Sequence, residues 1–338
     1  MSRVSVVRKP FTPRDLEADR LSGTLWARLE ALSYIHVSSG RERVELLRSD
    51  LARPENLRAI EEALMRGDTH RLERLTEAVR IGYIDNVVYG GKVCVPGSTI
   101  KGLLRSRLEL CPSQGGTSLS CLHTDAPPLI QPPPPGQHGW RHARIWWPSV
   151  AEDRGPRCDP IASGDYSLCI VCDLFGAPGV VGRVAPSNFC CEASCCEPRD
   201  LPYGERVYAI KPGSTLRGCI HFNSLTLEEL GLLLIAMGIT AQSTVGVEVL
   251  IGKHKYAYRD MGRARFVLEK LVVPARLVET LRSVASVEPR VSGSIATIEG
   301  NELAKFVKES IERALSAYPQ YRSLHGFSEA KKRDEVIR

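Results

Sequence analysis

The chain has 338 residues, which suits one large domain with insertions, and a formal net charge of +6. Hydrophobic residues make up 43% of it, which excludes a disordered protein and allows a sizeable core. The first 20 residues lack an apolar core, so we expect no signal peptide. Arginine greatly outnumbers lysine, which suits RNA, although genome composition or thermal adaptation explains the bias equally well.

The N-terminal part predicts a strand followed by an excursion. Apolar and polar residues alternate from Leu25 to Ala31, as in a half-buried strand, and the pattern continues to Val37. Residues 41–80 are highly charged, with leucines near helical spacing, and predict a helical insertion. Two interpretations stay open: a solvated helical insertion, or an arm that contacts RNA or a neighbouring subunit.

A strand-to-helix turn follows at Pro96, and the helix is predicted over 100–110 with Ser98 or Thr99 as its N-cap. Free N–H groups at a helix start favour an anion, and a glycine allows close approach of the backbone. The turn is therefore either a phosphate site or an ordinary capped helix. Its candidate RNA-binding residues are Gly97, Ser98, Lys101 and Arg105.

Residues 111–165 are rich in proline and glycine and predict a long loop insertion, which needs a staple to stay folded. We expect the eleven cysteines of a cytoplasmic chain to be reduced, so metal binding is favoured over disulfides. Cys169 and Cys172 form a CxxC pair, whose spacing lets two thiolates bind one zinc ion. The predicted ligands of this structural zinc are Cys121, His123, Cys169 and Cys172, with Cys111 and Cys158 as further candidates.

A second cysteine cluster is formed by Cys190, Cys191, Cys195 and Cys196. Their spacing is tighter than in most zinc sites. A metal site, a redox pair and packed free thiols all stay open for this cluster.

The C-terminal half predicts strands at 207–210 and 218–222, a helix that begins with a Thr226–Glu229 capping box, and a last strand at 261–273. That helix is apolar nearly all round, so we expect it to be buried. Its apolar run is half a bilayer span, which argues against a membrane partner. A C-terminal helix is predicted within 299–338, with a frayed tail after Arg322.

The order of these elements predicts a single α+β domain over 1–338. Its core would cover about 20–40, 81–110 and 166–275, with insertions at 41–80 and 111–165. A ferredoxin-like (RRM-type) βαββαβ core with two excursions explains this order better than a doubly wound sheet.

Four stretches in this order resemble the RAMP superfamily of CRISPR systems: IDNVVYGGKVCVPGSTIKGLLRSRLE, CIVCDLFGAPGVVGRV, IKPGSTLRGCIHFNSLTLEELGLLLIAMG and IGKHKYAYRDMGRARFV. Within it, they look most like the repeated backbone subunits of type III Csm and Cmr complexes, above all the Csm subunit. The resemblance implies a ferredoxin-like fold and assembly with copies of itself and sibling subunits along a CRISPR RNA. In active members it implies cleavage of a bound single-stranded target RNA.

The resemblance also implies site residues. Asp85 matches the aspartate that lies near the target strand, where a carboxylate can act as general base or hold a divalent ion such as Mg²⁺. Without the resemblance, Asp85 would simply end a strand or start an Asx-turn. The further RNA-binding candidates are His36, Arg183, Lys253, Lys255 and Arg263; a packed histidine and solvated loop charges are the alternatives.

Three functions follow from the sequence. The first is a type III backbone subunit that binds CRISPR RNA through its phosphates and cleaves target RNA with Asp85. The second is the same subunit as a purely structural, guide-binding protein. The third, outside CRISPR, is a zinc-stabilised module that binds single-stranded nucleic acid.

Overall fold

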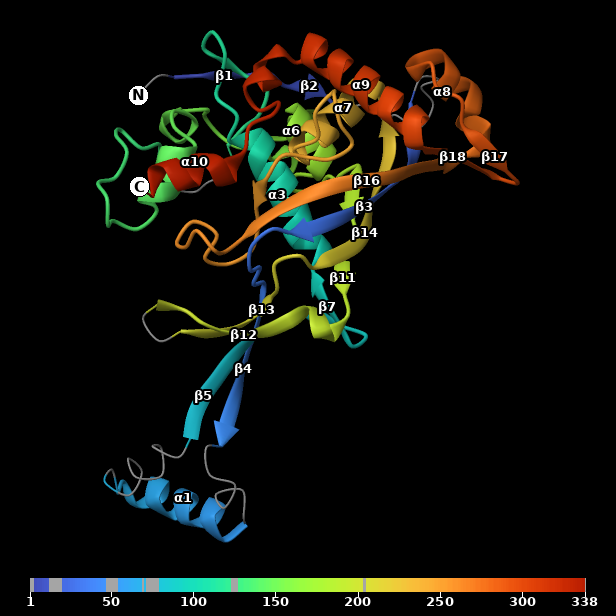
Figure 1. The fold of residues 1–338 in the computed structure, drawn as a ribbon. Coiled ribbons are helices and arrows are strands. Elements are labelled where there is room, and N and C mark those ends of the chain that lie inside the picture. The colour runs from blue at the N-terminus through green and yellow to red at the C-terminus, as the bar shows by residue number, and fades with distance from the viewer. Residues whose placement is uncertain are drawn as a thin grey trace.

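The computed structural model describes residues 3–11, 20–46, 54–68, 70, 79–122, 127–202 and 205–337. Within this part, two main sheets, two small two-stranded sheets and a layer of helices form an α+β structure with a long projection at one end (Figure 1). Of the described helices, none is both long and apolar enough to cross a membrane.

The larger sheet of the described residues has ten strands, and four of them form its centre in the order β16–β3–β14–β11. These strands are antiparallel to their neighbours, with Ala27 of β3 opposite Gly218 and Leu268. Their bounds are β3 (Leu21–Ala31), β11 (Phe189–Cys191), β14 (Thr215–Leu225) and β16 (Arg263–Pro274). The other strands of this sheet are β6 (Val88–Tyr89), β7 (Lys92–Val95), β10 (Val184–Pro186), β15 (Val249–Leu250), β17 (Arg290–Ser292) and β18 (Ile295–Glu299).

Strand β3 has the alternating burial that its sequence predicts. Leu25, Ala27 and Leu29 are buried in the core, whereas Trp26 on the other face is exposed. The predicted continuation to Val37 is wrong in detail, because β3 ends at Ala31 and a bend follows. The chain then makes two isolated bridges, Tyr34 with Met261 and Ile35 with Ile210.

Helices cover the buried face of this sheet. The chain passes from β3 to β10 and β11 through α3 (Gly97–Glu109), and from β14 to β16 through α7 (Leu227–Ala236). As predicted, α7 begins with the Thr226–Glu229 capping box and is buried on all sides. It packs so closely on α9 (Gly300–Ala317) that a Cβ at Gly231 would lie 2.0 Å from the Ser310 carbonyl oxygen.

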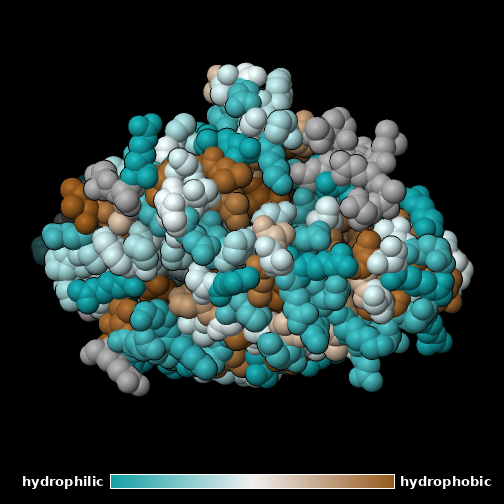
Figure 2. Space-filling model, turned by 90° about the horizontal axis from the view of Figure 1, so that it is seen from above, coloured by the Kyte–Doolittle hydropathy of each residue, from teal (hydrophilic) through white to brown (hydrophobic). Residues whose placement is uncertain are grey.

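The outer surface of the helical layer faces solvent. Helix α9 buries Leu303, Phe306 and Ile311, while Lys305 and Glu312 are exposed. Seen from above, this face is mostly hydrophilic, with scattered hydrophobic areas (Figure 2). The neighbouring helix is α8 (Val278–Ala285), which follows the short turn η5 (Ala275–Leu277).

A smaller four-stranded sheet has the order β12–β13–β5–β4. Strands β4 and β5 extend away from the body as an arm with α1 near its far end (Figure 1). The bounds are β4 (Ser38–Leu46), α1 (Pro54–Arg66), β5 (Val79–Asn86), β12 (Cys196–Asp200) and β13 (Arg206–Ile210), with η3 (Ala193–Cys195) before β12.

The prediction of a helical insertion over 41–80 is therefore only partly correct. Residues 41–46 and 79–80 are strands, and Glu42 and Val44 pair with Ile84 and Ile81. Charged residues with helical spacing favour a helix locally, but ladder pairing with a distant strand overrides that preference. Residues 47–53, 69 and 71–78 lie outside the described residues.

The insertion after α3 contains only short elements, in line with its composition. They are β8 (Thr117–Ser118), α4 (Trp140–Ile145), η2 (Ser149–Ala151), α5 (Pro160–Ser163), β9 (Ser167–Leu168) and α6 (Ile170–Phe175). The N-terminal segments β1 (Ser5–Val6) and β2 (Lys9–Pro10) pair with β8 and β9. The N-terminus thus helps to fix the insertion.

The predicted frayed tail after Arg322 is wrong. The chain continues through η6 (Pro319–Ser323) into α10 (Glu329–Val336). Arg107 of α3 forms a fully buried ion pair with Glu329, and Arg333 is also buried. Buried charges that find partners fix the tail, although its composition resembles that of a solvated end.

Candidate functional sites

Four buried cysteines form a candidate metal centre. The sulfur atoms of Cys121, Cys158, Cys169 and Cys172 all lie within 4.8 Å of one another. Cys169 is the N-cap of α6, and its sulfur accepts a hydrogen bond from the Cys172 N–H at 3.4 Å. This first helical turn is the reason that a CxxC spacing brings two sulfurs to one point, and the insertion supplies the other two.

The arrangement fits a zinc ion. Four thiolates at about 2.3 Å from a tetrahedral zinc lie about 3.8 Å apart, and Cys121 is 3.5 Å from Cys172 and 3.7 Å from Cys169. The hydrogen bond with Cys121 is the main cause that lowers the pKa of Cys158 and raises that of Cys172. Four protein ligands leave no position for water, so the site is suited to a structural role.

Two arginines lie beside this centre. Four thiolates and one Zn²⁺ carry a net charge of −2, which is costly in a buried site unless it is compensated. The Arg105 guanidinium donates to the Cys172 sulfur at 3.4 Å, and the nearby Cys158 is among the causes that raise the pKa of Arg8. Arg105 also donates to Glu109 at 2.7 Å and to the Gly176 carbonyl at 2.8 Å. Arg105 therefore lies beside the cysteines, whereas the sequence analysis predicted that it contacts RNA.

Three of the four predicted zinc ligands lie in the cysteine cluster. Cys121, Cys169 and Cys172 come together, and Cys158, a further candidate in the sequence, is the fourth cysteine of the cluster. His123 lies outside the described residues. Cys111 is elsewhere, next to Ser323, where burial raises its pKa to about 11.

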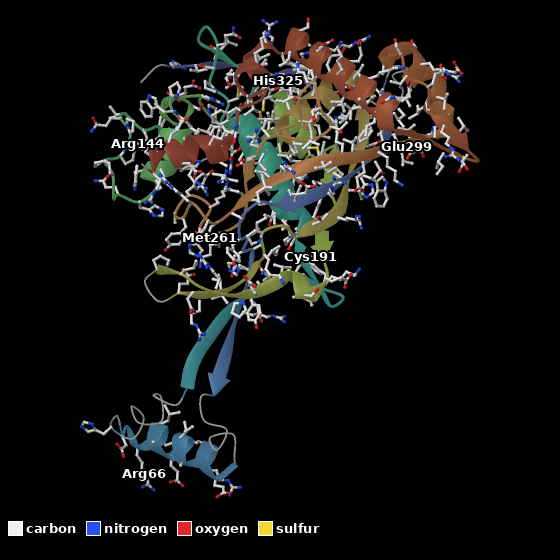
Figure 3. All side chains as sticks on the ribbon, viewed as in Figure 1. Arg66, Arg144, Cys191, Met261, Glu299 and His325 are labelled. Carbon is white, nitrogen blue, oxygen red and sulfur yellow. A yellow bond between two sulfur atoms is a disulfide. The ribbon has the colours of Figure 1, made fainter. Side chains whose placement is uncertain are left out.

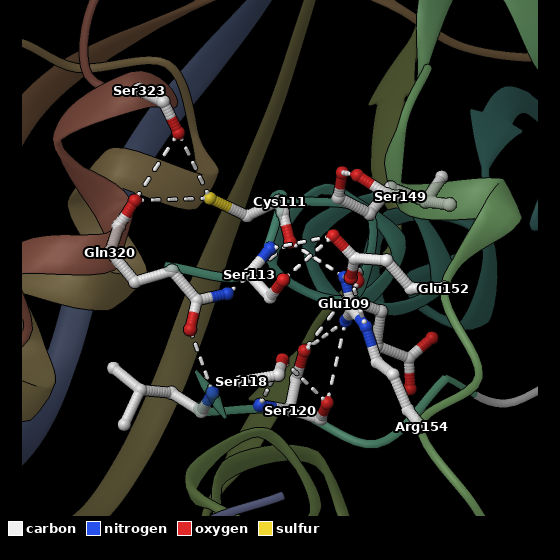
Figure 4. A network of polar contacts seen from close by, with 12 residues as sticks. Glu109, Cys111, Ser113, Ser118, Ser120, Ser149, Glu152, Arg154, Gln320 and Ser323 are labelled. Atoms are coloured by element: carbon white, nitrogen blue, oxygen red, sulfur yellow. Dashed lines mark hydrogen bonds and ion pairs between the residues drawn. The ribbon is translucent and has the colours of Figure 1, made fainter. Parts of the chain in front are cut away.

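A buried polar network fixes the insertion to the core (Figure 4). Arg154, with a side chain 1% exposed, pairs with Glu152 and donates to the carbonyl oxygens of Glu109 and Cys111. Glu152 in turn accepts from the Ser113 N–H and hydroxyl, both at 2.9 Å. The network joins the end of α3 to residues 113–154 and so positions the two insertion cysteines beside α6.

The second cysteine cluster contains disulfides, which corrects the expectation that all eleven cysteines are reduced. Cys94 is bonded to Cys190, and Cys191 to Cys195. Cys94 and Cys190 lie directly opposite each other on β7 and β11, with a Cα–Cα distance of 4.1 Å. Ladder register causes this juxtaposition across 96 residues, and no local spacing reveals it.

The catalytic candidate Asp85 is half-buried near the end of β5. It lies opposite the irregular stretch of β4 between Ser38 and Glu42, where the register shifts. Its neighbour Asn86 is buried: the side chain accepts from the Val37 N–H and donates to the Tyr208 carbonyl. Asn86 thus fixes the backbone that carries the Asp85 carboxylate.

His36 is fully buried, so its packed interpretation holds and the ring does not present a surface to RNA. Its Nδ1 lies 2.8 Å from the Tyr208 carbonyl, and burial is the main cause that lowers its pKa. The His36 carbonyl accepts from the Lys253 N–H at 2.8 Å. Gly252, with φ +87°, allows this approach, since a Cβ there would lie 2.5 Å from the same oxygen.

The turn before α3 is built differently from the prediction. Pro96 is the N-cap and no side chain near the start of α3 caps the helix; instead the Gly97 N–H donates to Asn188 at 2.9 Å. Gly97 is buried, and a Cβ would lie 2.2 Å from the Pro186 carbonyl oxygen, so the glycine serves packing with β10. Ser98 remains exposed.

The other basic candidates have intramolecular partners. Arg183 pairs with Asp173 at 3.0 Å, Arg263 with Glu248 at 2.6 Å, and Lys253 with Glu205 at 2.6 Å. Lys255 is half-buried, and burial lowers its pKa. Lys101 is also half-buried, and burial, followed by the charge of Arg105, lowers its pKa.

Arg333 is a positioning residue that sequence reasoning missed. Its guanidinium donates to the carbonyls of Lys255, Tyr258, Arg259 and Met261 at 2.6–3.0 Å. It therefore fixes the loop 252–262 from α10. A single arginine in a charged tail gives no sequence signal for such a role.

Comparison with known proteins gives one family. The family model of the RAMP superfamily matches residues 28–223, which is more than half of the chain. The matched range includes Asp85, α3 and the four clustered cysteines. No curated protein matches this chain.

Proposed function

Since this chain belongs to the RAMP superfamily, and membership implies an RNA-binding protein of CRISPR systems, we propose that it is a backbone subunit of a type III effector complex. Csm-type subunits are the nearest by their motifs. Copies of the chain and sibling subunits would line a CRISPR RNA, each binding it through its phosphates. Backbone contacts carry no base information, so the guide alone selects the target.

The observation that carries this proposal is the order β16–β3–β14–β11, with α3 and α7 as the two connections. Numbered along the chain, these strands run fourth, first, third, second. A split βαβ topology of this kind supports a ferredoxin-like core. The RNA-facing elements we propose are the start of α3, with Ser98 and Lys101, and the loop 252–262.

We assign target cleavage to Asp85. In this step the ribose 2′-oxygen attacks the adjacent phosphorus, the P–O5′ bond breaks, and the leaving O5′ takes a proton from water. The products are a 2′,3′-cyclic phosphate and a 5′-hydroxyl. The Asp85 carboxylate accepts the 2′-hydroxyl proton or holds a divalent ion such as Mg²⁺. Asp85 is half-buried beside the irregular stretch of β4, in the smaller sheet, and we propose that the target strand crosses this sheet.

The test is single-turnover cleavage of a labelled target RNA by the reconstituted complex, with Mg²⁺ and with chelator. Asp85→Asn should retain target binding and lose cleavage by about 10² to 10⁴-fold, the range for one general base. The matched control is Asp165→Asn, an exposed carboxylate in the insertion. Unchanged cleavage by Asp85→Asn would contradict the assignment of Asp85. No cleavage by the wild-type complex would favour the second function, a structural subunit without turnover.

A further inference from the structure

A groove of about 670 Å³ opens beside α4, on the insertion. Residues 136–142 form one wall, and Tyr256 and Ala257 of the loop 252–262 form the other. In Figure 3, Arg144 lies on the side of the molecule that carries α10, and Met261 ends the loop below it. The groove belongs neither to the zinc centre nor to the Asp85 site.

The groove has an aromatic lining. Trp140, His142 and Tyr256 line the groove, and the His142 and Tyr256 rings meet edge-to-face with centroids 5.2 Å apart. Flat rings on both walls offer surfaces on which an unstacked nucleobase can stack. The volume exceeds the needs of one base.

Positive charge lies at the groove, on Arg141 of its lining and on the exposed Arg144 next to Trp140. The Arg141 and Arg144 guanidinium carbons lie 4.7 and 5.4 Å from the Trp140 ring centroid. Throughout the described part of the chain, neither arginine has an acidic partner, and the buried Arg141 Nε has no hydrogen-bond partner. Other arginines of this protein, such as Arg183, are paired. Two uncompensated guanidinium groups beside a ring favour a phosphate that is attached to a base.

The groove continues from the proposed RNA face. Lys253 contacts the His36 carbonyl, and Tyr256 follows three residues later, so at most about 11 Å of chain separates them. Arg333 fixes the loop between these two points through its bonds to the Lys255 and Tyr258 carbonyls. The loop wall of the groove is therefore pre-organised.

We infer that this groove binds one unstacked nucleotide of single-stranded RNA, with its base on Trp140 and Tyr256 and its phosphate at Arg141 and Arg144. The inference rests on the proposed RNA-binding function. It adds a base-stacking subsite, formed by the insertion, to a face that otherwise contacts phosphates. Because stacking accepts every base, the subsite adds affinity without sequence choice.

The experiment is fluorescence anisotropy of a 20-nucleotide mixed-sequence RNA with the full-length, zinc-loaded protein between 50 and 300 mM salt. Trp140→Ala should weaken binding by about 5- to 100-fold, the range for one stacked base, and Trp140→Phe should restore most of it. Arg141→Ala with Arg144→Ala should weaken binding and reduce the salt slope by about 1.4, as expected for two contacts to a single strand. Arg282→Ala, an exposed and ion-paired arginine of α8, is the control.

The outcomes separate the two proposals. Binding by the wild type with unchanged affinity in the Trp140 and arginine variants overturns the groove and leaves the proposed function standing. No binding by the wild type at 50 mM salt overturns the proposed function itself. Variants that bind RNA normally but no longer co-purify with sibling subunits would assign the groove to a protein partner and would also overturn the inference. Equal zinc content and thermal unfolding show that each variant is folded.

Discussion

Several buried ionisable side chains in this protein lie next to a partner of opposite charge. The clustered thiols have Arg105 and Arg8, Arg107 has Glu329, and Arg154 has Glu152. Each match offsets part of the cost of burying a charge. The two unmatched arginines beside Trp140 stand out against this pattern.

Cys172→Ser should remove zinc and lower stability, because metal binding contributes folding free energy and a serine oxygen is a poor zinc ligand. Atomic absorption should give one zinc per wild-type chain and much less than one in the variant, with a clearly lower Tm. Cys111→Ser, a buried thiol outside the cluster, is the control and should keep its zinc. A fully zinc-loaded Cys172→Ser protein would contradict the site.

His142 should make stability depend on acid pH. Burial, followed by the charge of Lys255, lowers its pKa to about 4 from 6.5 in the unfolded chain. Between these values the unfolded state binds the proton and the folded state does not, so stability falls as pH decreases from 6.5 to 4, by on the order of 3 kcal/mol. Denaturant unfolding of wild type and His142→Phe should show a smaller decrease in the variant. Parallel curves would contradict this role.

Two segments extend from the core: the insertion after α3 and the arm formed by β4, α1 and β5. The insertion depends on Arg154, whose replacement by methionine leaves Glu152 buried without its partner. We expect Arg154→Met to cost about 3–5 kcal/mol in the free energy of unfolding and to expose residues 113–154 to proteolysis. Arg282→Met, at an exposed pair, should stay within about 0.5 kcal/mol of wild type. Equal stability of both variants would show that the network is dispensable.

The arm should be separable from the core. Replacement of residues 47–78 by a short glycine-serine turn removes α1 and keeps the β4–β5 pairing. We expect an unchanged zinc content and a Tm within a few degrees, since α1 lies far from the body (Figure 1). Loss of folding would contradict the independence of the arm; loss of assembly alone would favour its contact with RNA or a neighbouring subunit.

Local patterns predicted those elements whose causes are local. The capping box at Thr226, the buried α7 and the alternation of β3 all depend on neighbours within a few residues. The Asn188 cap of α3, the Cys94–Cys190 disulfide and the strands of the arm depend on partners far along the chain. No spacing in one sequence encodes such pairings.

The residues of the candidate sites also separate into those whose position has a local cause and those that depend on distant parts of the chain. The CxxC pair was visible because one helical turn defines its geometry, whereas Cys158 joins the cluster only through the path of the insertion. Basic residues proposed for RNA, such as Arg105 and Arg183, have acidic partners that charge counting cannot foresee. Arg333 organises the loop 252–262 from a tail that looks unstructured by composition.

Taken as one molecule, the protein combines a sheet-and-helix body, a zinc-type staple and a projecting arm (Figure 1). The staple and the Arg154 network hold the insertion, and the insertion carries α4 next to the loop 252–262. The groove beside α4 therefore adjoins the loop 252–262, which is one part of the proposed RNA face. The protein's net charge of +6 favours a polyanion in low salt.

The most direct measurement is the affinity of the purified protein for two unrelated 20-nucleotide single-stranded RNAs across a salt titration. We expect equal affinities for both sequences and a steady weakening with salt, because the contacts are to phosphates and base faces. No binding at 50 mM salt, or a strong preference for one sequence, would contradict a guide-independent RNA-binding subunit.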